Sequence, residues 1–251
     1  CGCPGAKIMS HIDAEPAFIL HLRPYRDSSA LIDVLSHRQG KVSCVVKGLR
    51  EGSKSRQAWR AGLQPFNLLL LSWRGRTELK TLSDVQPQRQ YRLAGQVQFY
   101  GLYLNELTQR LLHDHDPHPD IFEHYVHSLA DLSQSGMSEA VLRRYEFALL
   151  RALGYGVEPG YCADNGSAVD PRGRYRFVPE YGMQRVAEGE LGFDGEVLLQ
   201  IAAGQFEGEA LRVAKRLTRS ALAPLLGDRP LRSRELFVGA AGGGDRGELT
   251  K

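Results

Sequence analysis

The chain has 251 residues, of which 42% are hydrophobic and 24% are charged, and its formal net charge is +3. This composition is typical of a globular protein and excludes collagen-like, mucin-like and wholly disordered chains. The longest uninterrupted apolar runs, such as residues 68–71, are far shorter than the roughly 18 to 20 residues that a helix needs to cross a bilayer. A chain of this length makes one large domain or two small ones.

The cysteines point to a reducing compartment. There are four of them, and the only close pair, Cys1 and Cys3, stands at the start of the chain. So few and so widely spaced cysteines do not form a disulfide framework. Because no signal-peptide pattern follows the first residues, we expect a cytoplasmic protein with reduced thiols.

Positive charge is concentrated in the first third of the chain. Residues 1–80 hold 13 Lys and Arg against 6 Asp and Glu, a net charge of +7, whereas residues 81–135 hold 3 against 7. A cationic region binds polyanions because each Lys or Arg displaces condensed counterions from a phosphate backbone. An ordinary solvated surface would show the same excess, so charge alone leaves both interpretations open.

The region from Ala17 to Asp84 predicts a small β-barrel. Short apolar or alternating runs rich in Val, Ile, Leu and Phe are separated by turn residues, as in strands, and Gly40 and Gly75 suit hairpin turns. Five strands in about 70 residues, with a non-strand connector after the third, fit an OB-fold. The expected strands are residues 17–23, 30–36, 41–47, 66–73 and 77–84, with the connector at residues 48–62.

Helices are expected after Pro87. Apolar residues recur every three or four positions from Val97 to Leu111, which is the spacing of a buried helical stripe. Ser138 is a candidate N-cap and Gly154 a candidate stop for a later helix. The other helices are expected at residues 119–132, 138–153, 196–203 and 207–226, with an irregular middle segment at 154–195 that holds a short hairpin near 175–178.

The predicted fold class is therefore α+β, an N-terminal five-stranded OB-fold β-barrel followed by an α-helical domain with an irregular middle segment. The expected domains are a disordered leader at residues 1–14, the OB-fold nucleic-acid-binding domain at 15–86, the helical domain at 87–238 and a disordered, Gly-rich tail at 239–251.

Enzymatic motifs are absent except for one histidine-rich stretch. No phosphate-binding glycine loop and no nucleophile elbow is present, but five of the eight histidines fall between His113 and His127. Imidazole and carboxylate ligands from His113 to Asp120 would suit a metal-dependent phosphohydrolase. Pro117 and Pro119 place the stretch in a loop, however, whereas metal sites draw ligands from rigid, separate elements. We expect no metal and no cofactor here.

Two further features suit binding to anions. Trp59 lies in the basic connector and could stack on unpaired bases, whereas Trp73 ends an apolar strand and is expected in the core. Arg212, Lys215 and Arg216 share one side of the last helix with Arg219. Such a stripe is either a solvated face or a grip for phosphates and carboxylates.

Several motifs occur in a specific order and spacing along the chain. They are AFILHLRP (17–24), VKG (46–48), LQPF (63–66), GLYLNEL (101–107), LRRYE (142–146) leading to LGYG (153–156), and AKR (214–216) leading to SRELF (233–237). In this arrangement the chain resembles the bacterial RecO family of recombination mediators. The family's fold, a basic β-barrel followed by helices, agrees with the outline derived from the residues.

The resemblance implies a non-enzymatic, monomeric protein of the RecF pathway that works in the cytoplasm at the nucleoid. Its implied partners are single-stranded DNA, double-stranded DNA, the acidic C-terminal tail of single-stranded DNA-binding protein (SSB) and RecR, and it would anneal complementary strands and help to load RecA. Some members carry a four-cysteine zinc site. Here Cys162 occupies the first position, but Asn165 stands where the second cysteine would be, so we expect no zinc.

The predicted contacts fall into two sets. Annealing requires neutralised phosphates rather than a reacting group, and we assign DNA contacts on the barrel to Arg23, Arg26, Lys41, Lys47, Arg50, Lys54, Arg56, Trp59, Arg74 and Arg76. An apolar slot with a cationic rim would hold the SSB tail, and its candidates in the helical part are Tyr103, Leu107, Arg143, Arg144, Leu153, Lys215 and Arg216.

Other interpretations remain open from the sequence. The helix arginines could only solvate a surface or pair with acids such as Glu146. The alternatives to a recombination mediator are the metal-dependent phosphohydrolase and an OB-fold protein that binds RNA.

Overall fold

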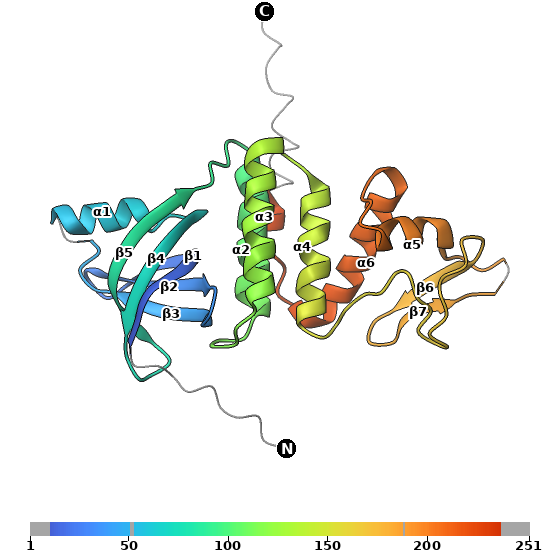
Figure 1. The fold of residues 1–251 in the computed structure, drawn as a ribbon, viewed down its shortest axis with the longest axis horizontal. Coiled ribbons are helices and arrows are strands. Elements are labelled where there is room, and N and C mark those ends of the chain that lie inside the picture. The colour runs from blue at the N-terminus through green and yellow to red at the C-terminus, as the bar shows by residue number, and fades with distance from the viewer. Residues whose placement is uncertain (1–10, 51–52, 188, 237–251) are drawn as a thin grey trace, which may run out of the picture. The chain divides into compact units, whose positions relative to one another are not determined.

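The computed structural model describes residues 11–50, 53–187 and 189–236 (Figure 1). Among these residues, no helix has the length and apolar character that crossing a membrane requires. The predicted leader residues 1–10 and the predicted tail 239–251 lie outside the described residues.

The chain forms two compact units, which we call the barrel unit and the inserted unit. The barrel unit comprises residues 1–137 and 230–251, and the inserted unit comprises residues 138–229. This differs from the expected single helical domain at 87–238, because the first two long helices cluster with the barrel. The chain therefore leaves the barrel unit once and returns to it.

The barrel unit is built on a closed five-stranded barrel with the strand order β1-β2-β3-β5-β4 (Figure 1). All neighbouring strands are antiparallel except β3 and β5, which pair in parallel through Cys44 with Lys80 and Val45 with Thr81. This is the predicted OB topology, and a helix, α1 (Lys54–Gly62), lies between the third and fourth strands. The strands are β1 (His11–Tyr25), β2 (Ser29–Ser36), β3 (Gly40–Val46), β4 (Asn67–Arg74) and β5 (Lys80–Gln90).

The first strand begins earlier than expected. Residues 11–14 were predicted to belong to a disordered leader, but they form the start of β1. Ile12 pairs with Trp73 of β4 and is buried in the barrel core. Burial of this side chain extends the strand beyond the alternating stretch that the sequence pattern marks.

Two helices of the barrel unit cover the outer side of β1. These are α2 (Val97–Leu111) and α3 (Pro119–Ser135). Ala17 and Ile19 belong to the core cluster inside the barrel, while Phe18 packs against the rings of Phe122 and Tyr125 with centroid distances of 5.4 and 4.9 Å. Both faces of this part of β1 are therefore buried, which explains its continuous apolar run.

The chain re-enters the barrel unit through a segment that α2 holds. The Glu106 carboxylate accepts hydrogen bonds from the backbone N–H groups of Arg232 and Ser233, at 2.9 and 2.8 Å, and from the Ser233 hydroxyl at 2.6 Å. Arg110 donates to the Pro230 carbonyl at 3.2 Å. Glu106 thus anchors the returning segment.

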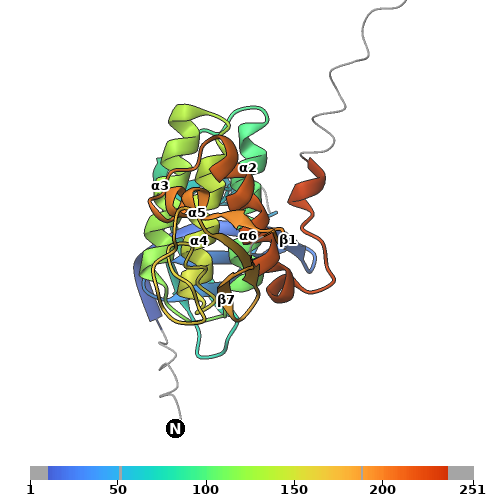
Figure 2. The same cartoon turned by 90° about the vertical axis from the view of Figure 1, so that its right-hand side faces the viewer.

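The inserted unit packs three helices and a small sheet around its own core. Helix α6 contacts both α4 and α5 (Figure 2). The predicted hairpin is present as β6 and β7, and a third short strand, β8, joins the sheet in the order β7-β6-β8. The elements are α4 (Glu139–Ala152), β6 (Arg174–Val178), β7 (Gly182–Arg185), β8 (Phe193–Asp194), α5 (Gly195–Ala202) and α6 (Gly208–Leu226).

Ser138 occupies the N-cap position of α4, as the sequence predicts, but its side chain makes no capping hydrogen bond.

Candidate nucleic-acid interface

Helix α2 lies against β1 and β2 of the barrel. Asn105 donates to the backbone carbonyls of Ile19 and Leu20, both at 3.2 Å, and accepts a hydrogen bond from Tyr125. Further along α2, Gln109 donates to the Asp33 carboxylate of β2 at 2.9 Å. This side of the barrel is therefore occupied by the protein's own helix.

Lys41 belongs to this covered side. Its ammonium donates to the Gln109 carbonyl at 2.8 Å and lies 3.3 Å from the Asp114 carboxylate. Lys41 was predicted to contact DNA, but its charge is already neutralised inside the barrel unit. Its position identifies it as a contact between the barrel and the loop that follows α2.

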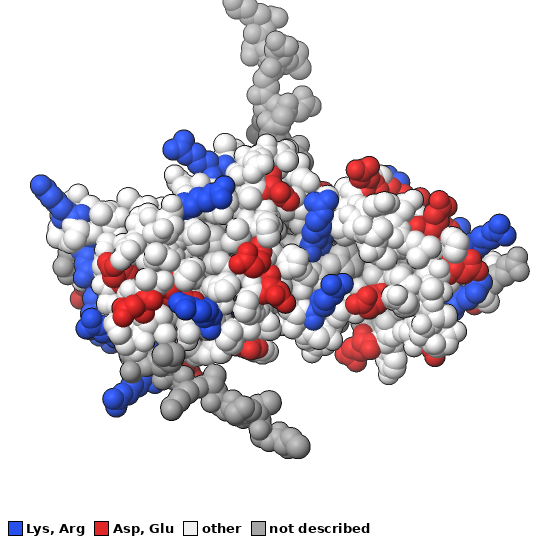
Figure 3. All heavy atoms as spheres, viewed as in Figure 1, with Lys and Arg blue, Asp and Glu red and all other residues white. Residues whose placement is uncertain are grey.

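Four other predicted cations gather where the β1–β2 hairpin meets the end of β3. We call Arg23, Arg26, Lys47 and Arg50 the cationic corner; all four are exposed. The pairings of Pro24 with Ala30 and of Ala30 with Val46 align these strand ends, and the Arg50 N–H donates to the Ser28 carbonyl at 2.9 Å. Figure 3 shows Lys and Arg side chains along the barrel end that carries α1.

Helix α1 follows the cationic corner in the chain. The Ser53 hydroxyl caps it by accepting a hydrogen bond from the Arg56 N–H, and Arg60 donates to the Leu49 carbonyl at 2.7 Å. The sequence predicts only a connector here, because its polar, basic residues lack a clear apolar stripe. The structure places the exposed Lys54 on this helix.

Trp59 is only partly available for stacking. Its half-buried ring packs against the barrel core, and the Arg56 guanidinium lies over it at 4.3 Å from the ring centroid. Packing against the core leaves less of this ring available to a base than a fully exposed ring would offer. Trp73, in contrast, is fully enclosed in the barrel, as the sequence predicts.

The remaining predicted DNA contacts lie on the β4–β5 hairpin. Arg74 and Arg76 are exposed there. Inside the barrel beneath the hairpin, Lys80 is buried and its ammonium donates to the carbonyls of Thr77 and Gly75 at 2.6 and 3.3 Å. The sequence analysis missed this buried lysine, although Lys80 alternates with Leu82 on the inward face of β5.

Burial changes the protonation of two groups in this interior. Burial lowers the pKa of the Lys80 ammonium from its ordinary value. Burial also raises the pKa of the neighbouring Cys44 thiol to about 12. The thiol is therefore neutral at physiological pH and behaves as an apolar core group rather than as a nucleophile.

Most of the basic residues predicted to contact DNA make no ion pair in the described structure. Eight of the nine basic residues predicted to contact DNA make no ion pair with any described acid; the exception is Lys41. In the inserted unit, five Lys and Arg side chains lie within ion-pair distance of a carboxylate: Arg143, Arg151, Arg174, Arg185 and Lys215. These eight cations therefore carry positive charge that the described acids do not neutralise.

The residues predicted to hold the SSB tail are only partly exposed. Tyr103 and Leu107 are buried in the barrel unit. In the inserted unit, Arg143 is 3% exposed and its guanidinium donates to Glu146 at 2.7 Å. Arg143 thus pairs with the acid that the sequence offered as its alternative partner, and it does not present a free charge. Leu153 is half-buried.

Arg144 lines a hollow in the inserted unit. The hollow measures about 820 Å³, and Glu139, Phe206 and Leu211 also line it. The Arg144 guanidinium lies 5.9 Å from the Phe206 ring centroid. Lys215 donates to both oxygens of Glu139 at 2.9 Å. Arg144 and Lys215, both predicted to hold the SSB tail, are therefore found at or beside this hollow.

Arg216, the last cation of the predicted tail site, lies over the Phe193 ring at 4.8 Å.

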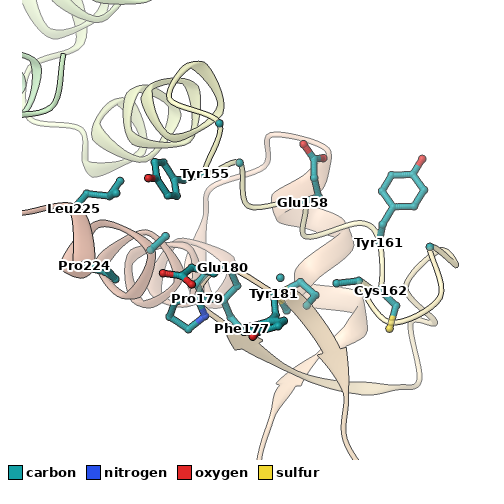
Figure 4. Close-up of a pocket in the computed structure, with 17 residues that line it drawn as sticks. Tyr155, Glu158, Tyr161, Cys162, Phe177, Pro179, Glu180, Tyr181, Pro224 and Leu225 are labelled. Carbon is teal, nitrogen blue, oxygen red and sulfur yellow. The ribbon is translucent and has the colours of Figure 1, made fainter. Parts of the chain in front are cut away.

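A second cavity of the inserted unit has the opposite character. It measures about 670 Å³, and its described lining includes three exposed tyrosines and two glutamates but no Lys or Arg. Tyr155 and Leu225 lie at one end of it, and Glu180 contributes a carboxylate (Figure 4). Carboxylates without cations make this cavity unsuitable for a nucleic-acid backbone or an acidic peptide.

The histidine-rich stretch after α2 forms a structural loop. The His115 N–H donates to the Lys41 carbonyl at 2.9 Å, and His118 lies 3.2 Å from Asp116. Gly40 has a positive φ of 68° and lies so close to this loop that a Cβ would overlap the Asp116 carbonyl. Among residues 11–50, 53–187 and 189–236, no three metal-ligating side chains come together.

Cys162 lies in the core of the inserted unit with Tyr175 and Met183. Its thiol is 3.7 Å from an Asp164 carboxylate oxygen. The absence of bound zinc stays a prediction, and elemental analysis of the purified protein tests it; about one zinc per chain after dialysis would contradict it.

Comparison with known proteins identifies the family. The profile described as Recombination protein O N terminal matches residues 9–91, and the one described as Recombination protein O C terminal matches residues 94–235. A protein of Haemophilus influenzae (strain PittGG) is 40% identical over 229 residues, which cover 90% of this chain and 96% of the relative. A protein of Pseudoalteromonas atlantica is 44% identical over 225 residues, covering 88% and 92%.

A protein of Vibrio parahaemolyticus is 41% identical over 236 residues, covering 92% of this chain and 96% of the relative. All three relatives are named DNA repair protein RecO. The two profiles together span both units, and the predicted resemblance is confirmed. This chain belongs to the RecO family.

Proposed function

We propose that the protein acts in DNA repair as a recombination mediator without a chemical step of its own. It binds single- and double-stranded DNA at the end of the barrel and anneals complementary strands. Together with RecR it helps to load RecA on single-stranded DNA that SSB covers, and it does so at the nucleoid. The relatives' name supports the repair role, and the observation that carries the mechanism is the unpaired charge of the cationic corner.

Annealing follows from charge neutralisation at such a corner. Two complementary strands repel one another through their phosphates, and cations that contact only the backbone reduce this repulsion while the bases stay free to pair. The four exposed side chains of the cationic corner, with Lys54 on the adjacent α1, can provide these contacts. No proton transfer or nucleophile is required.

The test is strand annealing in the absence of ATP. Complementary oligonucleotides, one with a fluorophore and one with a quencher, are mixed with the purified protein, first bare and then coated with SSB. We expect faster annealing in both cases, and an RNA competitor should inhibit less than single-stranded DNA of the same sequence. No acceleration with bare strands, or stronger inhibition by RNA, would contradict the proposal.

For the SSB tail we propose the hollow lined by Arg144 and Phe206. An acidic peptide with an apolar side chain needs a cation for its carboxylates and an apolar wall. Arg144 supplies the cation and Phe206 the wall. Arg143 was also predicted to contact the tail, but it pairs with Glu146, so we assign the contact to Arg144. Arg216 on α6 remains a second candidate contact.

Titration with a fluorescent SSB-tail peptide tests this assignment. Arg144→Ala should weaken peptide binding about tenfold, because a charge-assisted hydrogen bond contributes about 1.5 to 3 kcal/mol. Annealing of bare strands should persist. Arg151→Ala, which removes an exposed arginine outside the hollow, is the matched control and should bind the peptide normally. Normal binding by Arg144→Ala would reject this site.

A further inference from the structure

The tip of the β1–β2 hairpin carries an aromatic residue among the cations of the corner. Tyr25 is the last residue of β1 and pairs with Ser29 at the start of β2. Between them, Arg26 adopts a positive φ of 53°, which is uncommon for a residue other than glycine. The tight turn keeps Tyr25 and Arg26 together at the surface.

The Tyr25 ring and the Arg26 guanidinium form a stack. The guanidinium carbon lies 5.1 Å from the ring centroid, within the range of a cation–π contact. Tyr25 is half-buried and Arg26 is exposed. Unlike Phe18, which contacts several rings in the interior, Tyr25 contacts no other aromatic ring among the described residues.

Two further cations of the corner lie on a segment beside this stack. The backbone hydrogen bond from Arg50 to Ser28 ties the segment that holds Lys47 and Arg50 to the hairpin tip. A polynucleotide held by these cations would therefore pass close to the Tyr25–Arg26 stack. Aromatic rings and guanidinium planes both accept stacked bases.

Other exposed tyrosines lack this setting. Tyr155, Tyr161 and Tyr181 line a cavity that also holds Glu158 and Glu180 and has no basic residue in its described lining (Figure 4). Trp59 has cations nearby, but its ring packs against the barrel core, whereas Tyr25 does not belong to that core cluster. Tyr25 thus combines partial exposure with a cationic environment.

We propose that the Tyr25–Arg26 stack is a platform for an unpaired base and gives the barrel a preference for single-stranded over double-stranded DNA. The inference rests on the proposed DNA-binding function and adds a residue to it. Bases in a duplex are already stacked on their neighbours and stay inside the helix. The cations therefore contribute to binding of both forms, whereas Tyr25 contributes only to binding of the single strand.

The experiment compares the affinities of Tyr25→Ala for oligo(dT) and for a duplex of the same length. Stacking on one aromatic residue contributes about 1 to 3 kcal/mol, so we expect about tenfold weaker binding of oligo(dT). Duplex binding should change less than about twofold, and Tyr25→Phe should bind both DNAs as the unchanged protein does. Because Tyr25 carries no charge, the salt dependence of oligo(dT) binding should not change.

Two further variants separate this proposal from its alternatives. Arg26→Gln should weaken binding of both DNAs and flatten the salt dependence, because it removes a phosphate contact as well as half of the stack. Tyr181→Ala, at an exposed tyrosine of the acidic cavity, should bind both DNAs normally. If Tyr25→Ala unfolds, Tyr25→Leu repeats the test. Thermal melting shows whether each of these two variants is folded.

Equal losses on oligo(dT) and duplex, or no loss on either, would reject the platform and leave DNA binding intact. Failure of the unchanged protein to bind either DNA would instead reject the proposed function.

Discussion

The cationic corner of the barrel unit differs from a group of paired cations in the inserted unit. The four cations of the corner lie on backbone segments that are hydrogen-bonded to one another, and none pairs with a described acid. In the inserted unit, Arg174, Arg185 and Lys215 lie 3.0, 3.3 and 2.9 Å from a carboxylate. Because like charges in a cluster repel one another, the corner is a feature that folding alone does not favour, and it is better explained by an anionic partner.

The two units also stabilise a buried cation differently. The inserted unit buries a complete ion pair, Arg143 with Glu146. The barrel unit buries the Lys80 ammonium against two backbone carbonyls. A carboxylate stabilises the buried Arg143 charge. Backbone carbonyls of the hairpin that carries Arg74 and Arg76 stabilise the buried Lys80 charge.

The largest expected effect is on the buried pair. Glu146→Ala leaves the Arg143 guanidinium, 3% exposed, without its carboxylate, and we expect the free energy of unfolding to fall by about 3 to 5 kcal/mol. Urea unfolding followed by circular dichroism measures it. The double variant Arg143→Met, Glu146→Leu should recover most of the loss. A loss below about 1 kcal/mol in the single variant would show that the pair is not needed.

A somewhat smaller effect concerns pH and the barrel interior. The Cys44 pKa is raised from 9.0 to about 12, so above pH 9 the unfolded chain loses the thiol proton while the folded barrel keeps it. The unfolded state then binds fewer protons, and stability falls as the pH rises from about 9 to 12. Between pH 9 and 11 this loss amounts to about 2 kcal/mol.

Urea unfolding of Cys44→Ala at a series of pH values isolates that contribution. The lowered pKa of Lys80 acts in the opposite direction, since stability rises with pH up to the ordinary lysine pKa, but Lys80 is present in both proteins. We expect the stability of the variant to fall less steeply above pH 9. Parallel curves for the two proteins would contradict the assignment.

The smallest effects are expected at the surface. Arg174→Gln removes an exposed ion pair with Asp194 and should cost less than about 1 kcal/mol. Lys47→Gln removes an exposed cation that pairs with no described acid, and should change stability by no more than about 0.5 kcal/mol while it weakens DNA binding. Thermal unfolding measures the stability of both variants, and DNA titration measures their affinity. A large loss of stability in Lys47→Gln would show that Lys47 stabilises the fold.

The barrel was predictable because its strands alternate. Residues such as Ile32 and Val34 of β2 and Leu69 and Leu71 of β4 point to the core at every second position, and this period is visible in the sequence. The position of α1 was not predictable from its polar residues. Its helix depends on the Ser53 cap and on packing of Trp59 against the barrel.

The candidate site was predictable in composition but not in arrangement. The sequence identifies an excess of Lys and Arg, yet it does not distinguish Lys41, which Asp114 neutralises, from Lys47, which is exposed and unpaired. Likewise, Arg143 and Arg144 are adjacent in the sequence, but only Arg144 lines the hollow. Pairing partners come from distant segments or from a helical turn, and these contacts form only in the folded chain.

The salt dependence of single-stranded DNA binding tests the central claim most directly. One variant replaces Lys47, Arg50, Lys54 and Arg56 with Gln, and its matched control replaces the paired Arg151, Arg174, Arg185 and Lys215 with Gln. Both changes remove four positive charges. If the barrel end binds the phosphates, the barrel variant should bind far more weakly, and the slope of log affinity against log salt should flatten by about 0.7 per lost contact, while the control keeps its slope. Equal slopes in the two variants, or a larger change in the control, would contradict the account.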